Sequence, residues 1–172
     1  RPASSAGDSL PPLAIFSSYR NPKRSELIEI DPGRRTARLL RGEWAVSPSW
    51  SPDGHRLAYA AAKENIVVID ADGTHLRDLT HGALRFVKAP AWSPDGTRIA
   101  FHATRDNTSW SVFTVDVDGG AAPHPVVAGT RGDQFFPAWS PDGGRLLLVV
   151  ASEDHPGTFD LAVTAAAGSA LR

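Results

Sequence analysis

The 172-residue chain contains neither cysteine nor methionine. The absence of cysteine excludes disulfide bonds, thiolate metal sites and a cysteine nucleophile. No apolar run approaches the roughly 18 residues of a membrane-spanning helix. The net charge is only -1, from 18 basic and 19 acidic residues. We therefore expect no membrane insertion and no broad electrostatic attraction to nucleic acid.

The sequence also lacks helical periodicity. No segment keeps a 3.6-residue apolar period for about ten residues, and 14 prolines and 15 glycines interrupt the chain. Residues 1–12 are rich in Pro, Ser, Ala and Gly and are predicted to form a flexible leader. Such a stretch often follows a removed signal peptide or a membrane anchor. It favours an extracytoplasmic location, either periplasmic or secreted.

What the sequence does contain is an internal repeat. The pentapeptide Trp-Ser-Pro-Asp-Gly occurs at 50–54, 92–96 and 139–143. A proline stands two residues before each tryptophan, and an arginine followed by an apolar run stands two residues after each glycine. A repeat of about 40–45 residues is typical of β-propeller blades.

Each repeat is predicted to contain four short strands. Ser-Pro-Asp-Gly suits the turn between the first two strands, because proline presets φ, aspartate bonds its own backbone and glycine accepts a positive φ. Alternating or β-branched segments and Asp-x-Asp-Gly turns mark the rest. In the second complete copy the strands are 86–92, 98–101, 110–115 and 124–127; in the first they include 65–69 and 76–79; the last has 159–163 and a degraded end at 165–172; a partial unit has 13–16, 26–30 and 37–40.

At these motifs the sequence resembles the TolB-like propeller repeats, which are relatives of the WD-repeat blades. The resemblance implies an all-β fold, a β-propeller of four-stranded antiparallel blades. About four blades are expected, of which the first lacks its inner strand. The predicted division is a leader at 1–12, a partial blade at 13–42, and blades at 43–82, 83–131 and 132–172.

The ring has no evident closure, because propellers use roughly four to eight blades and nothing after residue 163 supplies the missing inner strand. Three explanations stay open. The chain is a part of a longer propeller, two copies form a homo-oligomer that completes a larger ring, or the chain is a small, imperfect four-bladed ring.

The two faces of such a propeller differ. The repeated turns lie on one face, where they act as structural devices: the tryptophans pack between blades and the aspartates cap their turns. The other face carries divergent loops, at 17–25, 61–64, 104–109 and 152–158, and the blade-linking segments 42–46, 82–88 and 132–136. Aromatic residues and arginine dominate binding hot spots. The binding candidates on this variable face are Glu43, Trp44, Arg85, Phe86, Lys88, Arg105, Asp106, Trp110, Asp133, Gln134, Phe135, Asp154 and His155. Packing between blades competes with ligand binding for Phe86 and Phe135.

No motif indicates a cofactor, a metal site or a catalytic residue. The Asp-x-Asp-Gly turns at 70–73 and 116–119 lack the terminal glutamate of a calcium loop. The six histidines form no metal-binding pair, and neither a nucleophile elbow nor a phosphate loop is present.

The leading hypothesis is therefore a non-enzymatic binding or scaffold module that recognises a protein, a peptide or a small ligand through the variable face. The alternative is an accessory propeller of a larger enzyme of the peptidase or lyase type, since the resembling propellers include such domains. An enzyme in its own right, acting through His102 or His155 on the variable face, is the third hypothesis.

Overall fold

The structure is a computed structural model that describes residues 14–21, 24–31, 35–41, 44–61, 64–118, 120–127, 132–152 and 154–166. Within these residues every regular element is a β-strand. The strands are β1 (Ala14–Asn21), β2 (Arg24–Asp31), β3 (Thr36–Arg41), β4 (Val46–Trp50), β5 (Arg56–Ala61), β6 (Asn65–Asp70), β7 (Arg77–Asp78), β8 (Arg85–Trp92), β9 (Arg98–Thr104), β10 (Trp110–Asp116), β11 (His124–Pro125), β12 (Gln134–Trp139), β13 (Arg145–Ala151) and β14 (Phe159–Ala165).

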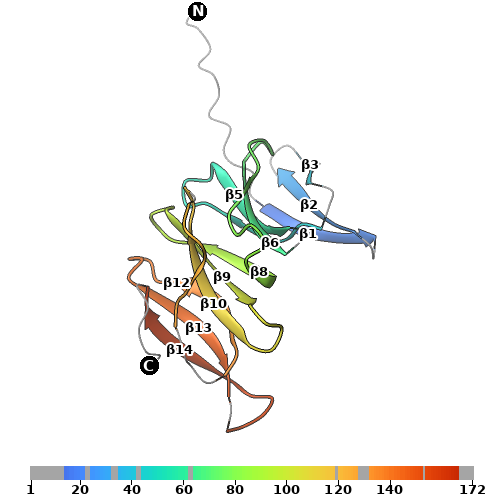
Figure 1. The fold of residues 1–172 in the computed structure, drawn as a ribbon. Helices are drawn as coiled ribbons and strands as arrows, with labels where there is room; N and C mark the ends of the chain where they lie inside the picture. The colour runs from blue at the N-terminus through green and yellow to red at the C-terminus, as the bar shows by residue number, and fades with distance from the viewer. Residues whose placement is uncertain are drawn as a thin grey trace, which may run out of the picture.

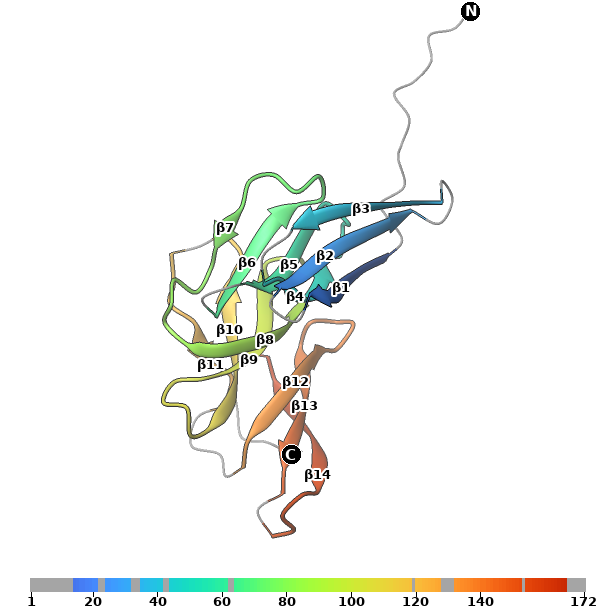
Figure 2. The same cartoon turned by 90° about the vertical axis from the view of Figure 1, so that its right-hand side faces the viewer.

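The strands of the described residues form four antiparallel sheets in chain order. The first sheet is β1-β2-β3, the second β4-β5-β6-β7, the third β8-β9-β10-β11 and the fourth β12-β13-β14. The sheets stack one after another, with the first and the last at opposite ends (Figures 1 and 2). The predicted fold class is confirmed: the chain is an all-β propeller assembly of antiparallel blades, of which the second and third have four strands and the described parts of the first and fourth have three.

The repeated turn owes its shape to a serine and an aspartate that hydrogen-bond each other and the backbone. In the third sheet, Ser93 Oγ donates to Asp95 Oδ1 at 2.5 Å and accepts the amide of Arg98 at 2.9 Å. Asp95 Oδ1 also accepts the amide of Thr97 at 3.0 Å. These bonds hold the pKa of Asp95 at about 2, chiefly through the Ser93 hydroxyl. The predicted role of the aspartates as turn caps is thus confirmed.

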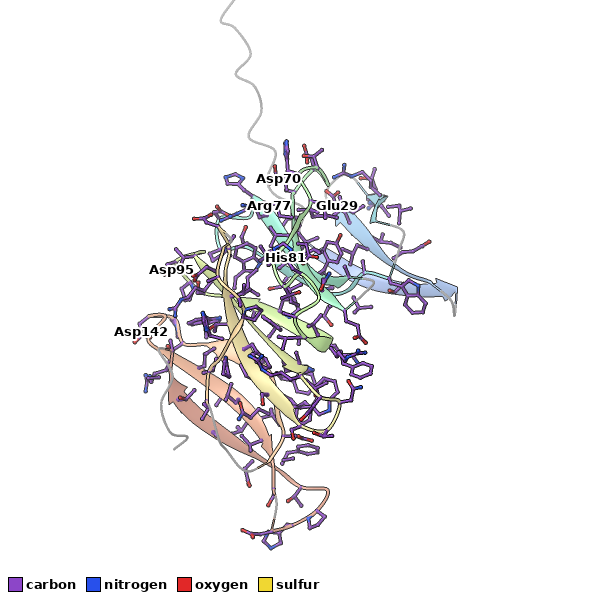
Figure 3. All side chains as sticks on the ribbon, viewed as in Figure 1. Glu29, Asp70, Arg77, His81, Asp95 and Asp142 are labelled. Atoms are coloured by element: carbon purple, nitrogen blue, oxygen red, sulfur yellow. The ribbon has the colours of Figure 1, made fainter. Side chains whose placement is uncertain are left out.

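The turns of neighbouring sheets lie together on one side of the molecule. Figure 3 shows Asp95 and Asp142 on adjacent turns. A Cβ atom on Gly143 would stand 3.6 Å from Cδ of Pro94, and Gly143 has a φ of +70°. Glycine is therefore favoured here by its backbone conformation, and the distance to Pro94 shows that the two turns lie in van der Waals contact range.

The repeated tryptophans join one sheet to the next. Trp92 Nε1 donates to the carbonyl of Ser49 at 2.9 Å, and Trp139 Nε1 donates to the carbonyl of Ala91 at 3.0 Å. An arginine of the preceding sheet covers each of these rings: the Cζ atom of Arg56 lies 5.1 Å from the Trp92 ring centroid, and that of Arg98 lies 4.8 Å from the Trp139 ring centroid. The predicted packing of these tryptophans between blades is confirmed.

The core consists of apolar layers between successive sheets. Ala58, Ala60, Ile66 and Val68 of the second sheet meet Ile99, Phe101, Phe113 and Val115 of the third. On the last sheet, the face that points away from the third is exposed at Leu147, Phe159, Leu161 and Val163. These side chains share one face of the sheet. Leu147 of β13 pairs with Val163 of β14, and Phe159, Leu161 and Val163 alternate along β14.

Parts of the predicted loops are strand instead. The loop expected at 17–25 is wrong, because β1 continues to Asn21 and β2 begins at Arg24, which leaves a tight hairpin. In the segments at 82–88 and 132–136, β8 begins at Arg85 and β12 at Gln134. The strand expected at 13–16 is longer and starts at Ala14. The leader at 1–12 and the chain end at 167–172 lie outside the described residues.

The hydrogen bonds of the repeated turn predict that a serine-to-alanine substitution lowers the free energy of unfolding more at a buried turn than at an exposed one. Ser93→Ala removes the acceptor of the Arg98 amide where Ser93 is buried, so we expect a loss of about 1–3 kcal/mol in the free energy of unfolding. Ser140→Ala removes the same bond to the Arg145 amide at an exposed turn, where water can replace the hydroxyl. Its cost should stay below about 1 kcal/mol. Urea unfolding of both variants measures the difference, and equal costs would contradict it.

Candidate ligand-binding site

The variable face carries a group of aromatic rings that spans the third and fourth sheets. We call it the aromatic cluster. Its rings come from β8, β9, β10, β12 and β14, near the ends of strands that adjoin the loops at 104–109 and 152–158. Its members are Phe86, His102, Trp110, Phe135, Phe136 and Phe159.

Four of these rings form a continuous row. The ring centroids of Phe86 and Trp110 are 6.1 Å apart, those of Trp110 and Phe135 are 5.7 Å apart, and those of Phe135 and Phe159 are 6.4 Å apart. These separations lie within the range in which aromatic rings attract one another through their quadrupoles. The row therefore links the inner strand of the third sheet to the last strand of the fourth.

His102 lies at the centre of the cluster and is only 3% exposed. Its ring stands edge-on to Trp110 at 5.5 Å, to Phe135 at 5.6 Å and to Phe136 at 5.1 Å between centroids. Its Nδ1 accepts the backbone amide of Phe136 at 3.3 Å. Burial, helped by the nearby charge of Lys88, lowers the pKa of His102 to about 4. His102 is therefore a neutral imidazole at pH 7, as its acceptor role requires.

A bulge in each inner strand explains how a ring can leave the sheet. The residue three positions before each repeated tryptophan has a positive φ: 54° at Ser47, 50° at Ala89 and 48° at Phe136. At each of these residues the strand register shifts. Such bulges redirect a side chain, and positive φ is costly for residues other than glycine. At the third bulge the side chain is a phenyl ring, that of Phe136.

The outer members of the cluster are open to solvent. Phe86 is 43% exposed, Phe136 61% and Phe159 62%, whereas Trp110 and Phe135 are half-buried. Single exposed apolar side chains are ordinary, but rings gathered in mutual contact are typical of binding surfaces. The arrangement offers a ligand a rigid aromatic surface with a buried, neutral histidine beneath it.

Three of the predicted binding residues, Phe86, Trp110 and Phe135, belong to the cluster. Two more flank it: Lys88 is paired across the strands with His102, and Arg85 is paired with Thr104. Both basic side chains are exposed. They place positive charge on the inner strand beside the aromatic row.

Three other candidates hold the protein itself together. Asp133 Oδ1 accepts the amide of Trp110 at 2.8 Å, and Gln134 Oε1 accepts the amide of Val112 at 3.2 Å, so both tie the fourth sheet to the third. Asp106 Oδ1 accepts the amide of Thr108 at 3.0 Å within its own loop. Hydrogen bonds from Thr108 lower the pKa of Asp106 to about 2. These carboxylate and amide oxygens position the loops around the cluster.

The remaining candidates lie apart from the cluster or outside the described residues. Trp44 is 53% exposed but takes part in none of the ring contacts among the described residues. The guanidinium of Arg105 lies 5.2 Å from the ring of the core residue Phe113. Asp154 and His155 are exposed in the loop before β14. The prediction for Glu43 falls on a residue outside the described ones.

Sequence reasoning did not place His102, Phe136 and Phe159 among the binding candidates. A comparison of equivalent positions within the chain could have found the first two. His102 stands ten residues after its tryptophan, where the other copies have Ala60 and Val149. Phe136 stands three before its tryptophan, where the others have Ser47 and Ala89. Phe159 begins its strand as Trp110 begins β10, so the two rings occupy equivalent positions.

Neither a metal-binding group of side chains nor a membrane-spanning helix is found within the part of the chain that the structure describes. No three His, Asp or Glu side chains there are grouped so that they could hold a metal ion. No helix there is long and apolar enough to cross a bilayer.

Comparison with solved structures places the fold among β-propellers. The chain is similar to a putative TolB from Agrobacterium tumefaciens, with a TM-score of 0.77 and 24% identity over 92% of this chain and 59% of that one. It is also similar to TolB from Acinetobacter baumannii, with a TM-score of 0.72 and 19% identity over 91% of this chain and 39% of that one. The nidogen/laminin complex contains a chain with a TM-score of 0.70 and 11% identity over 92% of this chain and 59% of that one.

These similarities show the fold, and the chain spans less than two thirds of each of those three proteins. No protein-family model and no curated protein sequence matches the chain. Enzymes share the fold: a puromycin-hydrolyzing peptidase from Mycobacterium tuberculosis has a TM-score of 0.64 and 20% identity, over 87% of this chain and 28% of that one. An oligogalacturonate lyase from Vibrio parahaemolyticus has a TM-score of 0.62 and 14% identity, over 87% of this chain and 42% of that one.

The buried histidine predicts a pH-dependent stability. Because the folded-state pKa of His102 is about 4, against an ordinary value of 6.5, the unfolded chain binds a proton first as the pH falls. The contribution of His102 is therefore complete above pH 6.5 and is lost between pH 6.5 and 4. We expect the free energy of unfolding to fall by about 1–3 kcal/mol over this window. Urea unfolding at a series of pH values measures it.

The matched control is His102→Val, which copies the residue at the equivalent position of the fourth sheet, Val149. Between pH 6.5 and 5 its free energy of unfolding should change much less than that of the wild type. The turn carboxylates Asp95 and Asp106 have pKa values of about 2 in the folded state, against an ordinary value of 3.8, so their contribution is lost only as the pH falls towards 4 and below, and to the same extent in wild type and variant. A parallel fall in wild type and variant would show that another group titrates.

Proposed function

We propose that the chain is a non-enzymatic binding module that recognises a protein or peptide segment through the aromatic cluster. The observation that carries the proposal is the row of four rings in contact, of which Phe86 and Phe159 are exposed, together with the exposed ring of Phe136 beside it. Folding alone does not require apolar rings on a surface. Preformed aromatic surfaces favour binding, because few rotatable bonds have to be fixed when a ligand docks.

The flanking charges suggest the chemistry of the ligand. Arg85 and Lys88 are exposed on β8 beside Phe86. Asp106 and Asp133 are engaged with backbone amides on the outer side of the cluster. A segment that combines aromatic or large apolar side chains with carboxylates directed towards β8 fits this distribution. His102 contributes a buried, uncharged floor to the site.

The arrangement of His102 supports binding rather than catalysis. A general base needs an oriented partner and access to a proton on the substrate. His102 Nδ1 is occupied by the amide of Phe136, and no hydrogen bond among the described residues joins this imidazole to a carboxylate. The proposal includes an extracytoplasmic location and a protein partner, both of which rest on the resemblance to TolB-like repeats.

The second candidate is an accessory propeller of a larger enzyme. Its support is the similarity to chains of a peptidase and a lyase, of which this chain spans 28% and 42%. In that case the aromatic cluster would hold the substrate of a separate catalytic domain, and the chemistry of recognition would be the same. A homo-oligomer that completes the ring is compatible with both candidate functions.

The experiment compares variants for the binding of a short peptide of alternating aromatic and acidic residues. We expect the wild-type chain to bind it, and the double variant Phe86→Ser/Phe136→Ser to weaken the affinity about tenfold or more, as is typical of hot-spot side chains. Isothermal titration calorimetry gives the affinities. A peptide with lysine in place of each acidic residue should bind more weakly, because Arg85 and Lys88 repel it.

The matched controls are Leu161→Ser and Trp44→Ser. Both change an exposed apolar side chain that lies outside the aromatic cluster, so the peptide affinity should remain as in the wild type. Thermal unfolding of all variants checks that the fold is kept. The proposal fails when the peptide does not bind, or when the double variant and the controls have equal affinities.

A further inference from the structure

One repeated tryptophan lacks the hydrogen bond that the other two make. Trp92 and Trp139 each donate to the carbonyl of the residue that precedes the tryptophan of the sheet before, Ser49 and Ala91 respectively. Trp50 holds the same place in the second sheet, and its indole Nε1 is buried without any hydrogen-bond partner. A buried donor without a partner is costly, and native proteins contain few of them.

The missing acceptor has a defined place in the fold. By the pattern of the other two junctions, it is a carbonyl on the inner strand of the first sheet. Among the described residues the first sheet has the order β1-β2-β3, and β1 is its edge. β1 contacts β4 as β5 contacts β8 and as β9 contacts β12. It therefore occupies the position of a second strand, and the place of the inner strand lies along its free edge.

A second buried atom points to the same junction. Of the buried side-chain nitrogen and oxygen atoms in the described part of the chain, Ser25 Oγ is the other that has no hydrogen-bond partner. Ser25 belongs to β2, and its carbonyl accepts the amide of Ala45 just before β4. Both unsatisfied atoms thus lie between the first and second sheets, whereas the later junctions have none within the described residues.

We propose that an inner-strand segment from a further copy of this repeat binds antiparallel along the free edge of β1, with one of its carbonyls accepting the Trp50 indole N–H. The strand orientation follows from the other sheets, in which β4, β8 and β12 pair antiparallel with β5, β9 and β13. Backbone hydrogen bonds to an exposed edge supply the affinity, as in other cases of strand addition.

The repeat also defines the sequence of the segment. The three inner strands that the structure describes all end in a bulged residue of positive φ, a proline, one further residue and a tryptophan. The residue between the proline and the tryptophan supplies the accepting carbonyl, as Ser49 and Ala91 do. Because β4, β8 and β12 are already paired within their own sheets, the segment comes from another repeat.

The test uses the chain and a synthetic peptide with the sequence of residues 84–93, which contains one complete inner strand. We expect saturable binding, together with a shift and slower solvent exchange of the Trp50 indole N–H in NMR spectra. Trp50→Phe keeps an aromatic ring but removes the donor, so it should weaken the peptide affinity about five- to tenfold. The unbound chain should tolerate this variant, because no hydrogen bond is lost.

The matched control is Trp139→Phe, which removes an indole donor at a junction whose acceptor is already in place. Its peptide affinity should equal that of the wild type at a temperature where both are folded. A scrambled peptide should not bind. The proposal is overturned when the peptide fails to bind, when the scrambled peptide binds as well, or when Trp50→Phe has no larger effect than Trp139→Phe. The proposal is also overturned when light scattering shows a dimer in which the Trp50 indole N–H is protected without any peptide. That result would show that a second molecule of the chain covers the edge of β1.

Discussion

The junctions between the second, third and fourth sheets depend on one interaction, the hydrogen bond from a tryptophan indole to a carbonyl of the preceding inner strand. Trp92 and Trp139 make this bond, and arginines of the preceding sheet cover their rings. The apolar layers supply most of the stabilisation, but such layers tolerate sliding because apolar contact has no direction. The indole bond has a direction and a length. It therefore sets how far the third and fourth sheets are displaced and rotated relative to the sheet before each.

The two faces of the molecule differ in how strongly the fold constrains their residues. On one face, the serine and aspartate of each repeated turn bind their own backbone, and adjacent turns approach one another closely. A change at these residues removes hydrogen bonds that hold the turn. On the other face the strands need only to be connected, so the connections have diverged. The aromatic cluster lies there, and Asp133 and Gln134 fasten the fourth sheet to the third beneath it.

The fold could be predicted from the sequence because its signals are local and repeated. A turn that closes on itself between Ser93 and Arg98 needs no information from the rest of the chain, and three copies of it define the sheets.

The candidate site was predicted only in part. Phe86, Trp110 and Phe135 are large rings near loop ends, but the place of Phe136 depends on a bulge, and the burial of His102 depends on three rings from two other strands. Neither is encoded in a short window. The interpretation of Asp133 and Gln134 as ligand contacts missed their bonds to backbone amides more than 20 positions earlier.

The bulge before each proline has a further consequence for how such a protein diverges. Ser47, Ala89 and Phe136 share one unusual backbone conformation, although their side chains have nothing in common. The proline and the strand register therefore determine the backbone geometry of the bulge, and the side chain of the bulged residue can vary. Natural selection can exchange a hydroxyl for a methyl or a phenyl group at these points, one blade at a time, and so alter what the surface recognises without disturbing the frame that carries it.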